Sequence, residues 1–222
     1  MLRYPKIPLS SLRSISRGRP NLLLSSCPFS STAVARGPLL SAIKHDHREL
    51  EACEPHIMNH KSADERIRYR NIFVWELARH SIGEEIVVYP AMEKHLNDGR
   101  EMASKDREQH QTIKEQLYRF QGLEANDPEF GPTFRSLLAS LQQHVKDEEE
   151  HDLPQLESKL DEDSLLKLSR SFERTKLFVP TRSHPMAPNV PPFETAVALL
   201  SAPIDKVADI FRKFPKEDGP ML

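Results

Sequence analysis

Four stretches of this chain repeat apolar residues at intervals of three, four and seven, the spacing that gives a helix one buried face. Turn-forming residues separate the stretches near positions 62–64, near 97–99 and across 122–132. Because short connections make consecutive helices antiparallel, the pattern predicts an all-α fold with an up-down-up-down four-helix bundle over residues 38–160. The stripes run through Ile43, Leu50 and Ile57; Phe73, Leu77 and Val87; Ile113, Leu117 and Phe120; and Phe134, Leu137 and Leu141.

Polar side chains interrupt every one of these apolar stripes. They are His47 in the first, His80 and Glu84 in the second, His110 in the third, and His144 and Glu148 in the fourth. A buried imidazole or carboxylate is costly unless another group pairs with it. Counting residues outward from each turn places these side chains at the same height in the bundle, to within about one helical turn. We therefore expect them to meet in one buried layer.

Imidazoles and carboxylates that meet in a dry core are typical of a metal site. Mixed nitrogen and oxygen ligands with bridging carboxylates suit two iron ions, with manganese and zinc as rivals, whereas one ion would leave ligands idle. A single buried histidine is more often a structural residue, so the prediction depends on all four helices contributing one. We assign the four histidines as terminal ligands and the two glutamates as bridges.

Further carboxylates lie beside this layer in the sequence. If the fourth helix is rotated, Glu149 replaces Glu148 as the inward carboxylate, and that alternative stays open. Otherwise Glu85, Glu149 and Glu150 are expected on a solvated face. Asp106 lies one turn before the histidine of the third helix, so we expect it either to support a ligand or to bind weakly itself.

The other histidines are excluded from the layer by their positions. At about 100° per residue, those of the first stretch point away from His47, and the one that follows His144 lies about 10 Å further along the helix axis. The rest lie near predicted loops. The excluded residues are His45, His56, His60, His95, His151 and His184.

Residues 161–222 read as a helical and proline-rich extension of the bundle. A short helix is predicted from Glu162 to Phe172, followed by a proline-rich linker over residues 180–192. Phe193 to Phe214 recovers amphipathic spacing, interrupted at Pro203. We expect this last stretch to dock on the bundle, with a membrane-surface or partner-binding role as the alternative. Its apolar positions are Val197, Leu200, Ile204, Val207 and Phe211.

The first 37 residues have the composition of a mitochondrial targeting segment. No Asp or Glu occurs before Asp46, while arginines punctuate a serine-rich background. We therefore expect import into mitochondria, with the matrix as destination. A merely disordered basic N-terminus, and a cytoplasmic protein, is the alternative.

Charge and cysteine usage exclude several classes of protein. The formal net charge of -2 gives no indication of a nucleic-acid partner and names no protein partner. No apolar run approaches the roughly 20 residues of a transmembrane helix. Removal of the targeting segment would take Cys27 and leave Cys53 alone, so no internal disulfide is expected. Cys53 is expected to be a small helix residue.

Four motifs resemble those of the hemerythrin-like, or HHE cation-binding, family. They are "KHDHREL", "HSIGEEIVVYP", the histidine before "QTIKEQL", and "HVKDEEEHDLP", and together they cover about residues 40–160. The resemblance implies a metal-binding four-helix bundle. The stretch after Leu160 looks like an extension found in fungal members, and it implies no chemistry of its own.

The chain departs from the oxygen-carrying hemerythrins at two places. Asp106 stands where the carriers have a histidine one turn before His110, and Glu149 stands where they have an aspartate. More carboxylate and less imidazole favours a higher-valent, less reversible iron pair. This puts reversible oxygen carriage in doubt.

Three classes of function fit these features. The first is a binding protein that senses or buffers iron, oxygen or its reduced forms. The second is an enzyme that reduces oxygen or peroxide, with Tyr89 or Trp75 as redox-active neighbours, although both are more often packing residues. The third is an interaction scaffold that its metal merely stabilises. We favour the binding protein, and the reaction of a rival enzyme is not encoded in the sequence.

Overall fold

The computed structural model describes residues 38–187 and 193–215, with the side chains of the second range described from residue 201 onward. The predicted targeting segment lies outside these residues. All the regular elements in the described ranges are helical, which confirms the predicted all-α class. They are α1 (Pro38–Asn59), α2 (Ala63–Gly83), η1 (Glu84–Val88), α3 (Tyr89–His95), α4 (Gly99–Gln121), α5 (Phe130–Asp147), η2 (Glu148–Asp152), α6 (Leu153–Lys159), α7 (Glu162–Lys176) and α8 (Phe193–Asp209).

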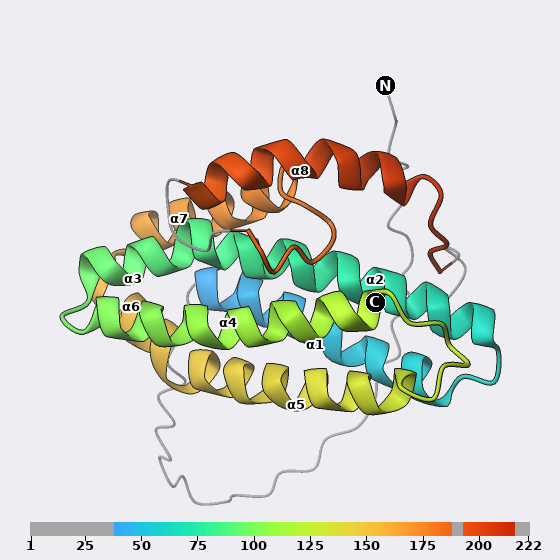
Figure 1. The fold of residues 1–222 in the computed structure, drawn as a ribbon. Helices are drawn as coiled ribbons and strands as arrows, with labels where there is room; N and C mark the ends of the chain where they lie inside the picture. Colours follow the sequence, from blue (N-terminus) through green and yellow to red (C-terminus); the bar gives the residue numbers. More distant parts are fainter. Residues whose placement is uncertain (1–37, 188–192, 216–222) are drawn as a thin grey trace, which may run out of the picture. The chain divides into compact units, whose positions relative to one another are not determined.

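Four long rods form the bundle, because η1 joins α2 to α3 and η2 joins α5 to α6 without a break (Figure 1). The rods are therefore α1, α2–α3, α4 and α5–α6. Contacts of α1 with α2, of α3 with α4, of α4 with α5 and of α6 with α1 close the ring. The predicted turns fall between these rods, and only the third differs slightly, since α5 already begins at Phe130.

The two interruptions, η1 and η2, are π-helical turns placed just before a proline. Tyr89 N–H donates to the carbonyl of Glu84, five residues back, and Leu153 N–H donates to that of Glu148. Pro90 and Pro154 follow directly; proline has no N–H and its ring collides with the carbonyl four residues earlier in an α-helix. A widened turn before each proline relieves that conflict while the rod continues.

Two apolar clusters fill the bundle, one toward each end. The first includes Leu50, Phe73, Ile113 and Phe134, and the second includes Ile43, Val88, Ala103 and Leu153. Along every rod the chain passes from one cluster to the other across the predicted polar positions. The polar layer therefore lies between two dry apolar layers.

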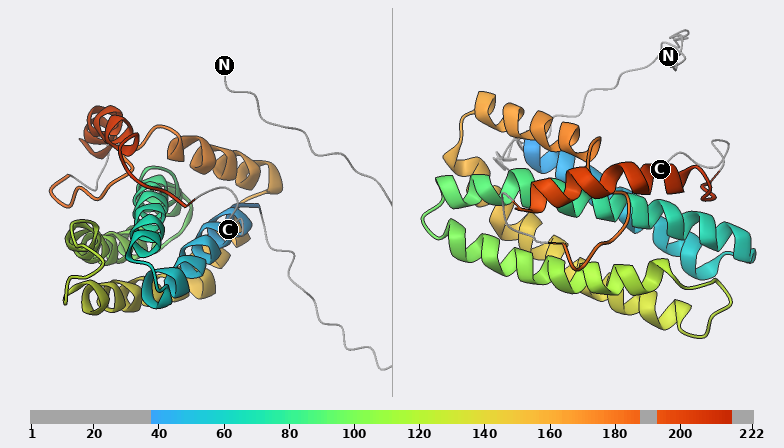
Figure 2. Two further views of the ribbon diagram at one scale, coloured as in Figure 1. Left: turned by 90° about the vertical axis from the view of Figure 1, so that its right-hand side faces the viewer. Right: turned by 45° about the horizontal axis from the view of Figure 1, so that its top comes forward.

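The extension packs on the outside of α1 and α2. Helix α7 contacts α1, α2 and η1, and it buries Leu165, Phe172 and Lys176. It runs one turn beyond the predicted end at Phe172. Figure 2 shows α7 and α8 on the side of α2 that faces away from α5.

Helix α8 docks differently from the sequence prediction. It continues through Pro203, and its buried side chains in the described part are Ala202 and Asp205. The apolar stripe expected to face the bundle instead points outward, since Ile204, Val207 and Phe211 are exposed. The stretch still docks on the bundle as expected, but through the residues after α8: Asn71 donates to the carbonyl of Lys213 (2.8 Å) and Arg68 to that of Phe214 (2.7 Å). Asp205 pairs with His184 of the linker (2.9 Å). The side chains of Val197 and Leu200 lie outside the described residues. No helix in the described ranges is long and apolar enough to cross a bilayer.

Candidate metal centre

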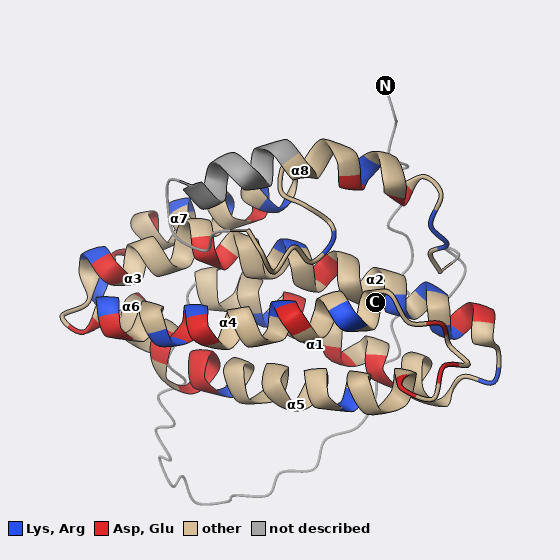
Figure 3. Ribbon diagram, viewed as in Figure 1, with Lys and Arg blue, Asp and Glu red and all other residues tan. Residues whose placement is uncertain are grey.

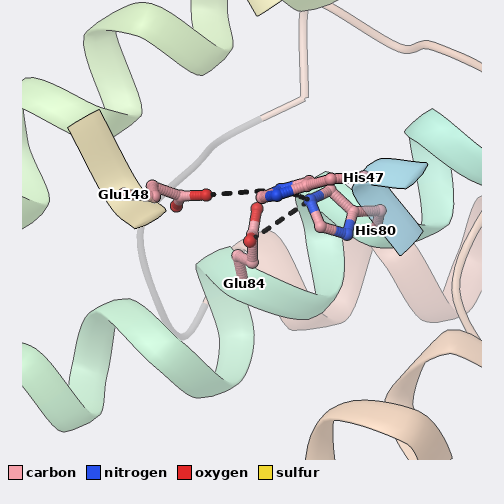
Figure 4. A group of neighbouring side chains, drawn as sticks. All are labelled: His47, His80, Glu84 and Glu148. Carbon is pink, nitrogen blue, oxygen red and sulfur yellow. Dashed lines mark hydrogen bonds and ion pairs between the residues drawn. The ribbon is translucent and has the colours of Figure 1, made fainter. Parts of the chain in front are cut away.

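The first half of the polar layer brings together His47 of α1, His80 of α2 and two glutamates (Figure 4). The Nε2 atoms of His47 and His80 lie 3.2 Å apart. Glu84 Oε1 lies 3.2 Å from Nε2 of His80, and Glu148 Oε2 lies 3.6 Å from Nε2 of His47. All four side chains are buried, so their polar atoms face one another rather than water.

The second half joins His110 of α4 to His144 of α5. Their Nε2 atoms lie 2.9 Å apart. Glu84 Oε2 lies 3.4 Å from Nε2 of His110, and Glu148 Oε1 lies 3.4 Å from Nε2 of His144. The phenol of Tyr89 enters this half as well, 2.9 Å from Nε2 of His110.

Each glutamate therefore reaches both halves, one carboxylate oxygen to each. The sequence placed each of them four residues after a histidine on the same rod, so that both side chains point to the same face. All six predicted positions meet in the layer. Glu148, and not Glu149, is the carboxylate that lies among the Nε2 atoms.

The outward nitrogen of every histidine in the layer also has a partner. The Nδ1 atoms pair with Glu149 from His47 (2.9 Å), Asp46 from His80 (3.1 Å), Glu85 from His110 (3.0 Å) and Gln109 from His144 (2.9 Å). An imidazole whose Nδ1–H is held by an oxygen presents Nε2 as a bare acceptor. Such partners fix ring orientation in metal sites and raise the basicity of the ligand nitrogen.

Three of these partners, the carboxylates, also contact a lysine or an arginine. Lys44 and Arg48 contact Glu149, Lys114 contacts Glu85 (2.6 Å), and Lys176 of α7 contacts both oxygens of Asp46 (2.7 Å each). Burial raises the pKa of Glu149, but its contacts with His47 and Lys44 lower it to about 2. These carboxylates are thereby kept ionised and able to accept from the imidazoles.

The four partners of the Nδ1 atoms form an outer ring around the layer, which the sequence did not predict: Asp46, Glu85, Gln109 and Glu149. Glu85 was expected on a solvated face and is fully buried, and Glu149 retains only 12% of its side-chain exposure. Both expectations were wrong because a cation from a neighbouring helix contacts each carboxylate: Lys114 of α4 for Glu85, and Lys44 and Arg48 of α1 for Glu149. Glu150 is exposed, as predicted. Lys176 also corrects the view that the extension carries no chemistry.

The remaining histidines and Trp75 lie outside the layer, whereas Tyr89 reaches it. His45, His60, His95 and His151 are exposed, His56 stacks on Tyr69, and His184 pairs with Asp205. Trp75 is half-buried beneath the guanidinium of Arg79 and is a packing residue. Tyr89, in contrast, belongs to the apolar core as expected and also places its hydroxyl in the layer.

The electrostatics of the layer depend on its two glutamates. Burial raises the pKa of Glu84, but the nearby imidazoles of His80 and His110 outweigh burial and hold it well below its usual range. Burial and the carboxylate of Glu84 raise the pKa of Glu148 well above its usual range. A divalent ion beside them would favour two carboxylates.

The family of the chain follows from comparison with known proteins. The family model described as "Hemerythrin HHE cation binding domain" matches residues 38–156. The chain belongs to this hemerythrin family. It is 54% identical over 175 residues to an uncharacterized hemerythrin-like protein of Schizosaccharomyces pombe, covering 78% of this chain and 86% of that relative. No solved structure is significantly similar to the chain.

The donor atoms of this hemerythrin-like layer fit metal ions. Within the described residues, both oxygens of Glu84 and Oε2 of Glu148 are buried without a hydrogen bond. Buried polar atoms in native proteins are nearly always satisfied, and a cation held by these oxygens would satisfy them. The Nε2 pairs are also about as far apart as two nitrogens that share one ion at about 2.1 Å.

Asp106 faces the same interior. It is fully buried, and both its carboxyl oxygens lack a hydrogen-bond partner among the described residues. Burial, together with Asp152, raises its pKa to about 7. Asp106 is not one of the side chains grouped within 4.8 Å of one another. Its role, as a support for the layer or as a weak ligand, stays a prediction.

Proposed function

We propose that the chain binds two iron ions in this layer and uses them to sense or buffer iron, oxygen or peroxide. His47 and His80 would hold one ion and His110 and His144 the other, with the two glutamates shared. The observation that carries the proposal is that each glutamate offers one oxygen to each histidine pair. Bound iron would supply reversible one-electron chemistry, which neither imidazole nor carboxylate has.

A sensing or buffering role is favoured by the dependence of the layer on a cation. The four imidazoles and two carboxylates are buried between two apolar clusters, where an unpaired charge is expensive. Metal occupancy should therefore be linked to the stability of the fold. If the chain is stably folded only when metal is bound, a partner that binds the folded form would respond to metal binding.

The test is metal content with single-histidine variants and matched controls. The full chain, loaded anaerobically with ferrous iron and desalted, should hold close to two irons per chain. His47→Ala and His144→Ala should each lose iron, while His45→Ala and His151→Ala, which remove exposed histidines from the same helical segments, should retain it. Wild-type protein without iron, or equal loss in the controls, would refute the proposal. Two tightly held zinc or manganese ions in place of iron would support the location of the metal site but contradict the assignment of iron.

A second function, reduction of oxygen or peroxide, is favoured by the position of Tyr89. Its hydroxyl lies 2.9 Å from His110 Nε2 and 3.4 Å from Glu148 Oε1, so a phenol that can give up an electron and a proton touches the layer. The iron-loaded protein, supplied with an external two-electron reductant such as ascorbate, would then reduce peroxide to water while the reductant is oxidised, and Tyr89→Phe would slow turnover with the iron content unchanged. Tyr118→Phe, at an exposed position, is the control. Absence of turnover would leave the sensing role.

The proposed compartment is the mitochondrial matrix. The support is the acid-free, arginine-punctuated N-terminal segment. Import of the full chain into isolated, energised mitochondria should shorten it, and Arg13→Gln/Arg17→Gln should reduce import. An unprocessed chain that stays outside would reject this compartment.

A further inference from the structure

The described part of the chain concentrates its exposed apolar side chains in the C-terminal extension. Eight large apolar side chains are exposed, and all but Tyr118 lie between residues 177 and 211. Among them Phe178 is 60% exposed, Ile204 72% and Phe211 85%. Scattered exposed apolar residues need no explanation, but a concentration of them in one region indicates an interaction surface.

Helix α7 presents a basic hollow next to these residues. Lys167, Arg170 and Arg174 follow one another at intervals of three and four, so they share one face, and they line the hollow together with Phe178. All four side chains are exposed. The neighbouring acid, Glu173, pairs instead with Lys176 (3.1 Å). Within the described residues, no carboxylate lies within ion-pair distance of either arginine.

Phe178 links the basic hollow to α8. Lys206 of α8 places its ammonium 5.9 Å from the ring centroid of Phe178 and donates a hydrogen bond to the carbonyl of Leu177. Val207 follows Lys206 directly and is exposed. In the left view of Figure 2, α7 and α8 both lie above α2, with α8 at the left and α7 at the right. Because Lys206 contacts both Leu177 and Phe178, the basic hollow and the exposed residues of α8 are neighbours. Together they are the basic-apolar face: Lys167, Arg170, Arg174, Leu177, Phe178, Ile204, Lys206, Val207 and Phe211.

The rest of the surface does not share this character. Figure 3 shows acidic and basic residues interspersed along the bundle helices. Many of the cations there have partners, such as Arg48 with Glu51 (2.7 Å) and Lys105 with Asp147 (2.8 Å). Arginines that have no ion-pair partner among the described residues, lying beside exposed apolar side chains, therefore distinguish the basic-apolar face from the bundle.

We propose that the basic-apolar face binds the surface of an anionic phospholipid membrane. Arg170 and Arg174 would bind the phosphates of headgroups, which guanidinium groups match with paired donors. Phe178, Ile204 and Val207 would enter the boundary between headgroups and acyl chains, as the apolar side of an interfacial helix does. The proposal is independent of the metal centre, which lies inside the bundle.

Other occupants fit this face less well. An acidic peptide would pair with the arginines but would leave the apolar side of α8 uncovered. A second copy of the chain, related by a two-fold axis, would bring the same arginines toward one another without opposite charge. A lipid surface satisfies both kinds of group at once.

The experiment measures partition of the full chain onto vesicles by co-sedimentation. Vesicles of phosphatidylcholine with phosphatidylglycerol should bind the chain, and vesicles of phosphatidylcholine alone should bind it far less. Each basic residue near an anionic surface contributes roughly fivefold in affinity, so Arg170→Gln/Arg174→Gln should lower the partition coefficient roughly 30-fold. Arg13→Gln/Arg17→Gln removes the same charge from the basic N-terminal segment and should have little effect. Equal loss in both double variants would overturn the proposal.

The apolar half of the proposal has its own test. Raising the salt concentration should weaken binding without abolishing it, and Ile204→Ser/Val207→Ser should remove the part that survives in salt. These exposed positions can be changed without disturbing the core, which circular dichroism checks. Three outcomes would overturn the proposal: elution of bound chain by millimolar inorganic phosphate, binding to polyglutamate in preference to vesicles, or a dimer that Val207→Ser dissociates.

Discussion

Lys176 should stabilise the bundle although it belongs to the extension. Its ammonium lies 2.7 Å from each oxygen of Asp46, and Asp46 in turn holds Nδ1 of His80 at 3.1 Å. The lysine is 5% exposed and the aspartate 2%. Lys176→Met keeps an unbranched side chain of similar length and deletes the ammonium, whose Nζ lies 4.8 Å from the ring centroid of Phe172, so the buried carboxylate loses its cation.

The magnitude follows from these contacts. Removing one partner of a buried ion pair costs about 3–5 kcal/mol, and the lower value applies because His80 still pairs with Asp46. With a urea m-value of about 2 kcal/mol/M, a loss of about 3 kcal/mol lowers the unfolding midpoint by about 1.5 M. Lys167→Met, the same change at an exposed site of the same helix, should alter the unfolding free energy by less than about 0.5 kcal/mol.

A double-mutant cycle decides whether the ion pair is the cause. In an Asp46→Asn background, where no carboxylate needs the cation, Lys176→Met should cost much less than in the wild type. Additive losses, or a midpoint for Lys176→Met equal to that of Lys167→Met, would refute the reasoning. Loss of Asp46 as a partner of His80 should also weaken metal binding by about 10- to 100-fold.

Three further predictions follow from the core, the thiol and the metal. Phe134→Ala should lower the unfolding free energy by about 3–5 kcal/mol, because the ring packs on Phe73 and Phe120 with centroids 5.2 and 4.9 Å apart. Tyr118→Ala, at an exposed site, should have little effect. A small effect of Phe134→Ala on urea unfolding would contradict this packing. Burial raises the pKa of Cys53 to about 12, so at pH 8 only about one thiol in 10,000 is ionised. In a Cys27→Ser chain, a disulfide reagent should therefore modify Cys53 only when the protein unfolds. Rapid labelling of the folded protein would contradict the burial of Cys53. Free metal at about 100 times its dissociation constant should add about 2.7 kcal/mol to stability per ion, and a melting temperature unchanged by chelator would contradict coupling of occupancy to folding.

The sequence predicts the bundle and the convergence of the layer because both depend on simple periodicities. Helical spacing selects the inward face of each rod, and distance from a turn sets height in antiparallel neighbours. His47 and His110, which stand alone in their helices, are found because the other two rods supply a partner at the same level. That His47 and the other five residues bind metal remains a prediction from the sequence, supported by the geometry.

The outer ring could not be found in the same way. Asp46 precedes His47 and points about 100° away from it, so a search along the inward stripe discards it, yet it faces the neighbouring rod and reaches His80. Its cation, Lys176, lies 130 residues later on a helix whose docking site has no local signal. Glu85 has the same difficulty, since only the tertiary structure brings Lys114 to it. The one sequence signal for carboxylates of this kind is an acidic residue that alternates with a basic residue next to a buried histidine.

Tyr89 is named as a neighbour of the site from the sequence, but its contact with His110 is not predicted by regular helix geometry. At 100° per residue Tyr89 lies about 140° around the helix from Glu84, so regular helix geometry turns it away. The π-helical turn places it one turn below Glu84 instead, since its N–H donates to the Glu84 carbonyl five residues back. The corresponding turn after Glu148 places Leu153 in that position, which carries no hydroxyl. The near-repeat His-x-x-x-Glu-Glu with its following proline therefore builds two similar halves, but the phenol reaches only the side of His110 and His144, so the two histidine pairs have chemically unequal surroundings.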